Sequence, residues 1–344
     1  MKKFLVLFLM LIVSCINAQL TITKVAELPI KVTNNAVCEG FIDNTPYLFS
    51  FAGIDSTKIY SGIHLQSFRY NIDTKMILRI PDLPDTRGKI ACAANRIANI
   101  IYISGGYHVY EDGHEVSSSK MHRYDIKNNI FLEDAMPIPV ATDDHVQAVW
   151  NDELIYIISG WSNTKNIPDV QIYNPKTNVW FNGTSTPNIS NYKSFGASGT
   201  IIGNTIYYFG GATSDKGFAI QNQLRIGEIN PENPKEIKWS IVSTNDVGYR
   251  MACASVNNEI HWLGGSNTTY NFNGLAYDKS GGVSTNNRDL FLSTSKLEFL
   301  KQFVAEIPMD LRGIANIKPK IKYIAGGMLA NQKVTQNIYK LEWK

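Results

Sequence analysis

The chain has 344 residues, of which 44% are hydrophobic and 18% are charged, and its formal net charge is +3. This composition excludes a disordered segment and is typical of a globular protein with a large core. Two of the positive charges, Lys2 and Lys3, lie in a segment that we expect to be removed. We therefore expect a nearly neutral mature protein with no nucleic-acid partner.

The first 18 residues have the layout of a secretory signal peptide. Two lysines precede an apolar run at 4–13, and small and polar residues follow it. The run is too short to span a bilayer, and we expect no transmembrane segment elsewhere. Cleavage after Ala18 would give a periplasmic or secreted protein of residues 19–344. Alternatively, the residues before Cys15 resemble a bacterial lipobox, which would give an outer-membrane lipoprotein anchored at that cysteine.

The rest of the chain contains six copies of one pattern, about 50 to 60 residues apart. In each copy a small-residue strand, a turn rich in Asn, Asp or Gly, and a short apolar strand end on Gly-Gly or a close variant. A variable loop, a strand such as "HRYDIKNN" and a closing strand with an aromatic residue and Pro follow in most copies. The pairs end at Gly53, Gly106, Gly160, Gly211, Gly265 and Gly327.

Four short antiparallel strands per copy make one propeller blade. The glycine pair, the "YD" or "YN" and the later Trp resemble the kelch repeat, which implies an all-β, six-bladed kelch-type propeller in a single domain. The last copy reaches only its third strand, at 337–343, whereas 20–29 has the pattern of an isolated fourth strand. We therefore expect the N-terminal strand to close the ring, which removes exposed sheet edges.

Three cysteines remain after Cys15: Cys38, Cys92 and Cys253. Each lies in a small-residue strand, so we expect them to be core thiols. No Cys or His pair has the spacing of zinc ligands, and no phosphate, dinucleotide or metalloprotease motif occurs. The sequence therefore predicts neither a metal nor a cofactor.

Charged residues gather where the innermost strands begin, around one mouth of the central channel. Aligning the repeats on their glycines places five residues at these strand heads: Glu39, Lys89, His145, Arg250 and Arg312. Lys193 precedes the head of the fourth blade, and Arg87 lies close to that of the second. This predicts an excess of positive charge that favours an anionic ligand. The alternative is that the arginines only join neighbouring blades.

His145 and Glu39 are the candidates for proton transfer. An imidazole beside two carboxylates can act as a general acid or base near neutral pH. Alternatively, His145 only bonds a neighbouring blade. Two loops after glycine pairs, 107–120 and 266–289, are rich in Tyr, Asn and Gly, and they include Tyr277. They are either part of a sugar-binding surface or plain solvated loops.

An exported, single-domain, six-bladed kelch propeller resembles the bacterial N-acetylneuraminate epimerase (sialate mutarotase) family in length, blade number and ring closure. The resemblance implies a sugar isomerase that acts on an anionic sugar, and it carries over no catalytic residues. Mutarotation needs a base for the anomeric hydroxyl and an acid for the ring oxygen. We expect His145 and Glu39 to supply them, and Arg250 and Arg312 to hold the anion, with Lys89, Arg87, Lys193 and Tyr277 as further binding residues.

Two other functions fit the same residues. A lyase for uronate polysaccharides would also use positive groups and a His or Tyr base. A non-catalytic propeller that binds a glycan or a protein would need no proton transfer at all. The sequence leaves open whether the protein is an enzyme, which ligand it takes and how many copies assemble.

Overall fold

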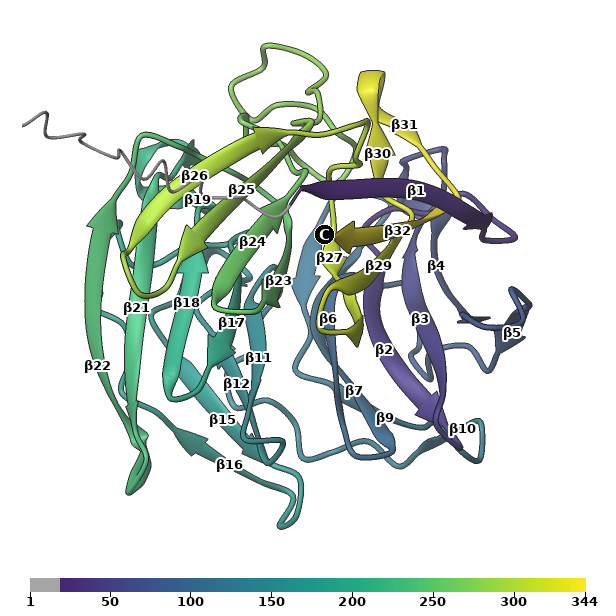
Figure 1. The fold of residues 1–344 in the computed structure, drawn as a ribbon, viewed down its shortest axis with the longest axis horizontal. Helices are drawn as coiled ribbons and strands as arrows, with labels where there is room; N and C mark the ends of the chain where they lie inside the picture. Colours follow the sequence, from purple (N-terminus) through teal and green to yellow (C-terminus); the bar gives the residue numbers. More distant parts are fainter. Residues whose placement is uncertain (1–18) are drawn as a thin grey trace, which may run out of the picture.

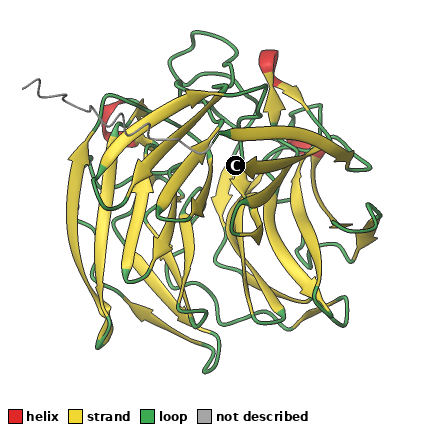
Figure 2. Ribbon diagram, viewed as in Figure 1, coloured by secondary structure: helices red, strands yellow, loops and turns green. Residues whose placement is uncertain are grey.

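The computed structural model describes residues 19–344, so the predicted signal peptide and the candidate anchor at Cys15 lie outside the described residues. Strands and loops make up nearly all of this range (Figure 2). Its helical elements are three short 3-10 turns: η1 (Tyr60–Gly62), η2 (Ser214–Lys216) and η3 (Ala330–Gln332). No described helix is long and apolar enough to cross a membrane.

Six antiparallel sheets surround a central axis and form the blades of a propeller, which confirms the predicted fold (Figure 1). Each of the first five blades has four main strands, which follow in chain order from the axis outward. The first has β2 (Ala36–Ile42), β3 (Thr45–Ile54), β4 (Ile63–Asn71) and β5 (Ile77–Ile80). The second has β6 (Ile90–Ile97), β7 (Ile100–Val109), β9 (Met121–Asp125) and β10 (Ile130–Leu132). The third has β11 (Val146–Trp150), β12 (Leu154–Ile158), β15 (Val170–Asn174) and β16 (Val179–Asn182). The fourth has β17 (Ser198–Ile202), β18 (Thr205–Phe209), β21 (Gln223–Asn230) and β22 (Asn233–Ser243). The fifth has β23 (Ala252–Val256), β24 (Glu259–Leu263), β25 (Arg288–Ser293) and β26 (Glu298–Phe303).

The sixth blade combines both ends of the described chain, as the sequence predicts. It contains β28 (Ala315–Lys318), β29 (Ile321–Ala325), β32 (Asn337–Trp343) and, outermost, β1 (Leu20–Glu27). The pairing runs from Leu20 opposite Trp343 to Glu27 opposite Asn337, and Figure 1 shows the two strands side by side. A short strand before this blade, β27 (Arg312–Gly313), pairs in parallel with β2 of the first blade.

Apolar clusters fill each of the six interfaces between neighbouring blades. Between the fourth and fifth blades, for example, the ring centroids of Phe209 and Trp262 lie 5.5 Å apart. Full burial of such a side chain contributes about 2 to 3 kcal/mol, so these interfaces hold the ring together. Cys38 and Cys92 are buried thiols, as expected, and Cys253 is half-buried. All three are free.

On one face of the propeller, the segments that connect the second strand of a blade to its third strand contain additional short strands that form a layer. They are β8 (Glu115–Ser117), β13 (Trp161–Ser162), β14 (Lys165–Asn166), β19 (Ala212–Thr213), β20 (Ala219–Ile220), β30 (Met328–Leu329) and β31 (Lys333–Val334). Aromatic and aliphatic side chains of this layer, which we call the cap, pack around Phe195, Tyr249 and Tyr270. The two long loops meet here, because Phe272 of one packs with Tyr107 and Val109 of the other.

Candidate functional site

At the head of the innermost strand of each blade, one residue lies opposite the second residue of that blade's glycine pair. These six residues, which we call the axial ring, are Asn34, Ala91, Asp144, Gly196, Arg250 and Asp310. All have φ between 48° and 65°, the left-handed region that favours Gly, Asn and Asp. Their backbones join successive blades: Gly196 N donates to Asp144 O at 2.8 Å, and Arg250 N donates to Gly196 O at 2.8 Å.

The axial ring corrects the alignment made from the sequence. Arg250 and the fourth-blade Gly196 occupy the predicted position, but His145 lies one residue beyond Asp144, and Arg312 lies two beyond Asp310. Glu39 is wrongly placed, because it lies five residues after Asn34, well along β2.

Four charged side chains meet at the ring and balance one another. Arg250 donates through Nη2 to Asp144 at 2.7 Å, and its Nη1 lies 3.4 Å from Asp310. Arg312 pairs with the same two carboxylates, at 3.3 Å from Asp310, and its Nε donates to Asn34 at 2.8 Å. The predicted excess of positive charge is therefore wrong at this position: each arginine is matched by an aspartate, and Arg250 is only 1% exposed.

Two further acids lie beside this group on the cap side. The side chain of Asp143 is buried and accepts a hydrogen bond from Ser117 Oγ at 2.6 Å. Burial and then the charge of Asp144 raise the pKa of Asp143 well above its usual value. Burial also raises the pKa of Glu115, which is half-exposed. In contrast, although burial opposes it, the charges of Arg250 and Arg312 lower the pKa of Asp144. We call Glu115, Asp143, Asp144 and Asp310 the axial acid cluster.

Tyrosines surround the cluster. Arg250 Cζ lies 4.8 Å from the ring centroid of Tyr249 and 5.1 Å from that of Tyr270. The hydroxyl of Tyr270 and Nε of Arg250 are buried without a hydrogen-bond partner in the described part of the chain. Tyr277 stacks on Phe218 and interacts electrostatically with Arg250, Asp144 and Glu115. The structure therefore brings the predicted Tyr277, Arg250 and Arg312 together.

The remaining predicted cations have other partners. The expected position of Lys89 at the mouth of the channel is corrected. Its side chain is fully buried, with Nζ 2.8 Å from Asp85 and 3.0 Å from Nε2 of His122. Arg87 lies over the ring of Tyr110, with Cζ 3.9 Å from its centroid. Lys193 lies 3.7 Å from Asp215. Substrate binding by Arg87 and Lys193 stays a prediction.

His145 does not titrate near neutral pH. Its Nε2 lies 2.9 Å from Ser104 Oγ in the neighbouring blade. Burial lowers the pKa of His145 to about 4, so the imidazole is neutral at pH 7. These contacts favour the alternative that His145 joins two blades, and catalysis by His145 stays a prediction.

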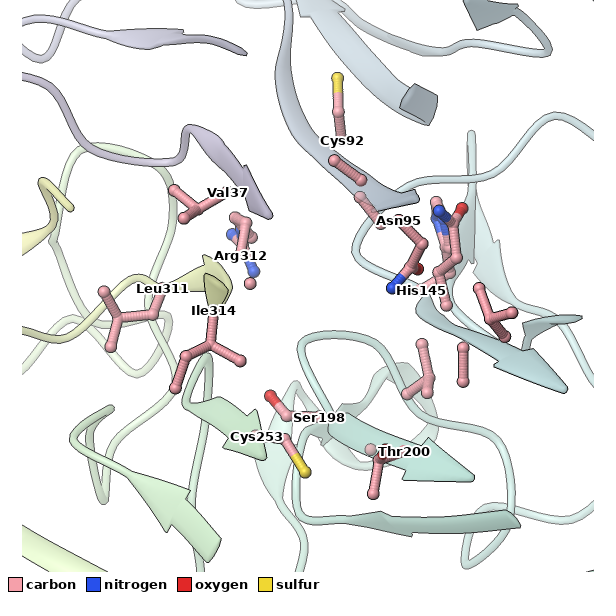
Figure 3. Close-up of a pocket in the computed structure, with 18 of the residues that line it drawn as sticks. Val37, Cys92, Asn95, His145, Ser198, Thr200, Cys253, Leu311, Arg312 and Ile314 are labelled. Atoms are coloured by element: carbon pink, nitrogen blue, oxygen red, sulfur yellow. The ribbon is translucent and has the colours of Figure 1, made fainter. Parts of the chain in front are cut away.

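On the other side of the ring, the channel contains a cavity of about 310 Å³. Side chains of all six blades surround it, including Val37, Asn95, His145, Ser198, Cys253 and Arg312 (Figure 3). Glu39 lines it too, but its partners are Arg96 and the backbone N–H of Asn316, so it forms no pair with His145. Within residues 19–344, no group of His, Cys, Asp and Glu side chains could hold a metal ion.

The sequence carried an overlooked signal for part of this site. Left-handed positions favour Asn and Asp, and polar residues recur before the inner strands as "TNN" at 33–35 and "TDD" at 142–144. Each of these segments contains an axial-ring residue, Asn34 in the first and Asp144 in the second, so they mark the head of the inner strand to within one residue. Glu115 gave no such signal, because it reaches the axis only through the pairing of β8 with β7.

Comparisons with known proteins support the fold. No family model matches the chain. Kelch-like protein 36 from Mus musculus is 24% identical over 115 residues, and that from Rattus norvegicus is 23% identical over 115 residues. These matches cover 33% of this chain and only 18% of each relative. A solved structure titled "Structure of YjhT" has a TM-score of 0.72 at 15% identity, and the match covers 91% of this chain and 95% of that one. The chain therefore has the fold of a six-bladed β-propeller, and part of it is similar to kelch-like proteins.

Proposed function

We propose that this protein acts on a carbohydrate at the axial acid cluster and interconverts sugar anomers. The observation that carries the proposal is the placement of Glu115 and Asp143, whose pKa values are raised, beside Tyr277 and Arg250. Groups with perturbed pKa values gather at functional sites. A carboxyl with a raised pKa is a stronger base once ionised and stays protonated to higher pH, so it can serve either half of the proton exchange.

Glu115 takes the role that the sequence had suggested for His145. It is half-exposed at the cap face, whereas His145 is neutral and bonded to Ser104. Tyr277 is also half-exposed there and offers a ring face and a hydroxyl, which suit the apolar face and hydroxyls of a sugar.

Arg250 is the cation of this site. Its Nε–H has no hydrogen-bond partner among residues 19–344 but is buried, and its Nη atoms pair with Asp144 and Asp310. Arg250 therefore orients these two acids rather than contacting the sugar itself.

The test follows the NMR signals of one pure anomer of N-acetylneuraminate after it is added to the protein. We expect equilibration faster than in buffer, and a loss of at least about tenfold for Glu115→Gln, because general acid–base groups contribute roughly 100-fold or more. Glu111→Gln, an exposed carboxylate in the same loop, is the matched control. An unchanged rate with wild-type protein would refute catalysis, and ligand binding without acceleration would favour the non-catalytic glycan-binding alternative.

A further inference from the structure

The channel beyond the axial ring is a second compartment that the proposed function does not use. Exposed residues of its lining, Asp152 and Asn316, lie at or near the turns between first and second strands, so it opens on the face opposite the cap. Much of the remaining lining consists of small residues of the inner strands, including Ala93, Gly199 and Gly313. A cavity of about 310 Å³ is at the lower end of the range for ligand pockets, which suits a small molecule.

Arg96 presents an unused donor group in this cavity. Its Nη1 donates to Ala98 O at 2.7 Å, and its guanidinium carbon lies 5.3 Å from the ring centroid of Phe41. These contacts fix the planar group in one orientation. Its closest carboxylate, Glu39, lies 4.0 Å away, which is beyond hydrogen-bond distance. Among the described residues Nε is buried without a hydrogen-bond partner, Nη2 makes no hydrogen bond, and the side chain as a whole is 25% exposed.

The other arginines of the axis differ in this respect. Arg250 and Arg312 each pair with two carboxylates and are 1% and 7% exposed. Arg96 is therefore the guanidinium of the channel that is both accessible and incompletely paired.

Glu39 is held beside Arg96 with one oxygen committed. Its Oε2 accepts the backbone N–H of Asn316 at 2.9 Å, and Oε1 is the atom that faces Arg96 at 4.0 Å. An Arg–Glu pair held apart in this way offers a donor surface and an acceptor a few ångströms from each other. A ligand that has both a carboxylate and a cationic donor would complete both groups at once.

The charges around this pair are balanced. Lys322 interacts electrostatically with Glu39 from β29 of the neighbouring sixth blade, and Asp152 is a second carboxylate of the lining. Two cations thus face two anions, with Arg312 and Asp144 already paired at the inner end. A singly charged ligand would leave one sign uncompensated, whereas a molecule with both charges preserves the balance.

We propose that the channel binds a small zwitterion of the α-amino acid type, with its carboxylate on Arg96 and its ammonium group on Glu39. Ser198, Thr200 and Asn95 extend into the same space and offer hydrogen bonds to a polar side chain (Figure 3).

Calorimetric titration of wild-type protein with three related ligands tests this directly. L-serine has both charges, L-serine amide lacks the carboxylate, and N-acetyl-L-serine lacks the ammonium group. We expect L-serine to bind at least about tenfold more tightly than either analogue, because a hydrogen bond to a charged group contributes about 1.5 to 3 kcal/mol. Equal affinities for the three, or no binding of L-serine, would overturn the proposal. This comparison does not depend on the folding of any variant.

Substitutions at Arg96 and Glu39 then test which residue binds the carboxylate and which binds the ammonium group. Arg96→Ala should weaken L-serine about tenfold and leave the amide unchanged, whereas Glu39→Gln should weaken L-serine and leave N-acetyl-L-serine unchanged. Arg79→Ala, which removes an exposed arginine outside the channel, is the matched control. If Arg96→Ala behaved like Arg79→Ala, the assignment would be wrong. Because the channel and Glu115 lie on opposite sides of the axial ring, failure here would leave the anomer test untouched.

Discussion

Replacing Arg250 by methionine should destabilise the propeller severely. The guanidinium is 1% exposed, and it joins Asp144 and Asp310, which are 2% and 0% exposed as side chains. Removing one member of a buried ion pair costs about 3 to 5 kcal/mol, because the remaining charge stays buried without compensation. Arg312 still pairs with both aspartates, so we expect the lower end of this range, about 3 kcal/mol.

Urea unfolding followed by tryptophan fluorescence measures this loss. Arg79→Met is the control, because Arg79 is 60% exposed and its pair with Asp82 should contribute less than about 1 kcal/mol. Adding Asp310→Asn to Arg250→Met restores the charge balance and should recover part of the loss. The reasoning would be refuted if Arg250→Met cost under about 1 kcal/mol, or if the double variant were less stable than the single one.

Two other substitutions test the ring and the buried imidazole. Gly211→Ala should cost about 2 kcal/mol more in urea unfolding than Gly113→Ala: both glycines have φ above 80°, but a Cβ at Gly211 would lie 2.7 Å from Phe195 O, and one at Gly113 would meet nothing within 4 Å. Similar losses would show that the close approach does not matter. His145 has a folded-state pKa of about 4, below its ordinary value, so the unfolded chain binds the extra proton and the free energy of unfolding decreases as the pH is lowered. Between pH 7 and pH 5, His145→Gln should reduce the decrease in the free energy of unfolding by about 2 kcal/mol. His114→Gln, at an exposed site, should leave that decrease unchanged. An identical pH dependence in the two variants would contradict the buried, neutral imidazole.

The architecture was predictable because its signals are local and repeated. Glycine pairs or close variants, turns of Asn and Asp, and alternating apolar strands recur in most copies, so an error in one copy does not change the blade count. The isolated strand pattern at 20–29 even predicted which strand completes the sixth blade, as the pairing of β1 with β32 confirms.

The site was predictable only in part, because it depends on register and on distant contacts. Glu39 was misplaced because aligning the copies on their glycines made no use of the polar segment at 33–35, which marks the head of the first inner strand. The predicted excess of positive charge at the mouth was wrong because Asp310 pairs with both arginines. Asp310 follows a proline and a methionine in a segment with no distinctive pattern. Arg96 was missed because only the closed ring shows that its neighbours leave it incompletely paired.

The pairing of β1 with β32 affects the order in which the protein can be completed. Leu20 lies opposite Trp343, so β1, the first described strand, pairs with the last described strand to be synthesised. The sixth blade is therefore incomplete until β32 is made, whereas the four main strands of each other blade come from one continuous segment and can pair in order of synthesis. The contact that closes the ring thus spans nearly the whole chain, and loops of this length close slowly. We therefore expect ring closure to be the last step of folding, after the other five blades have formed.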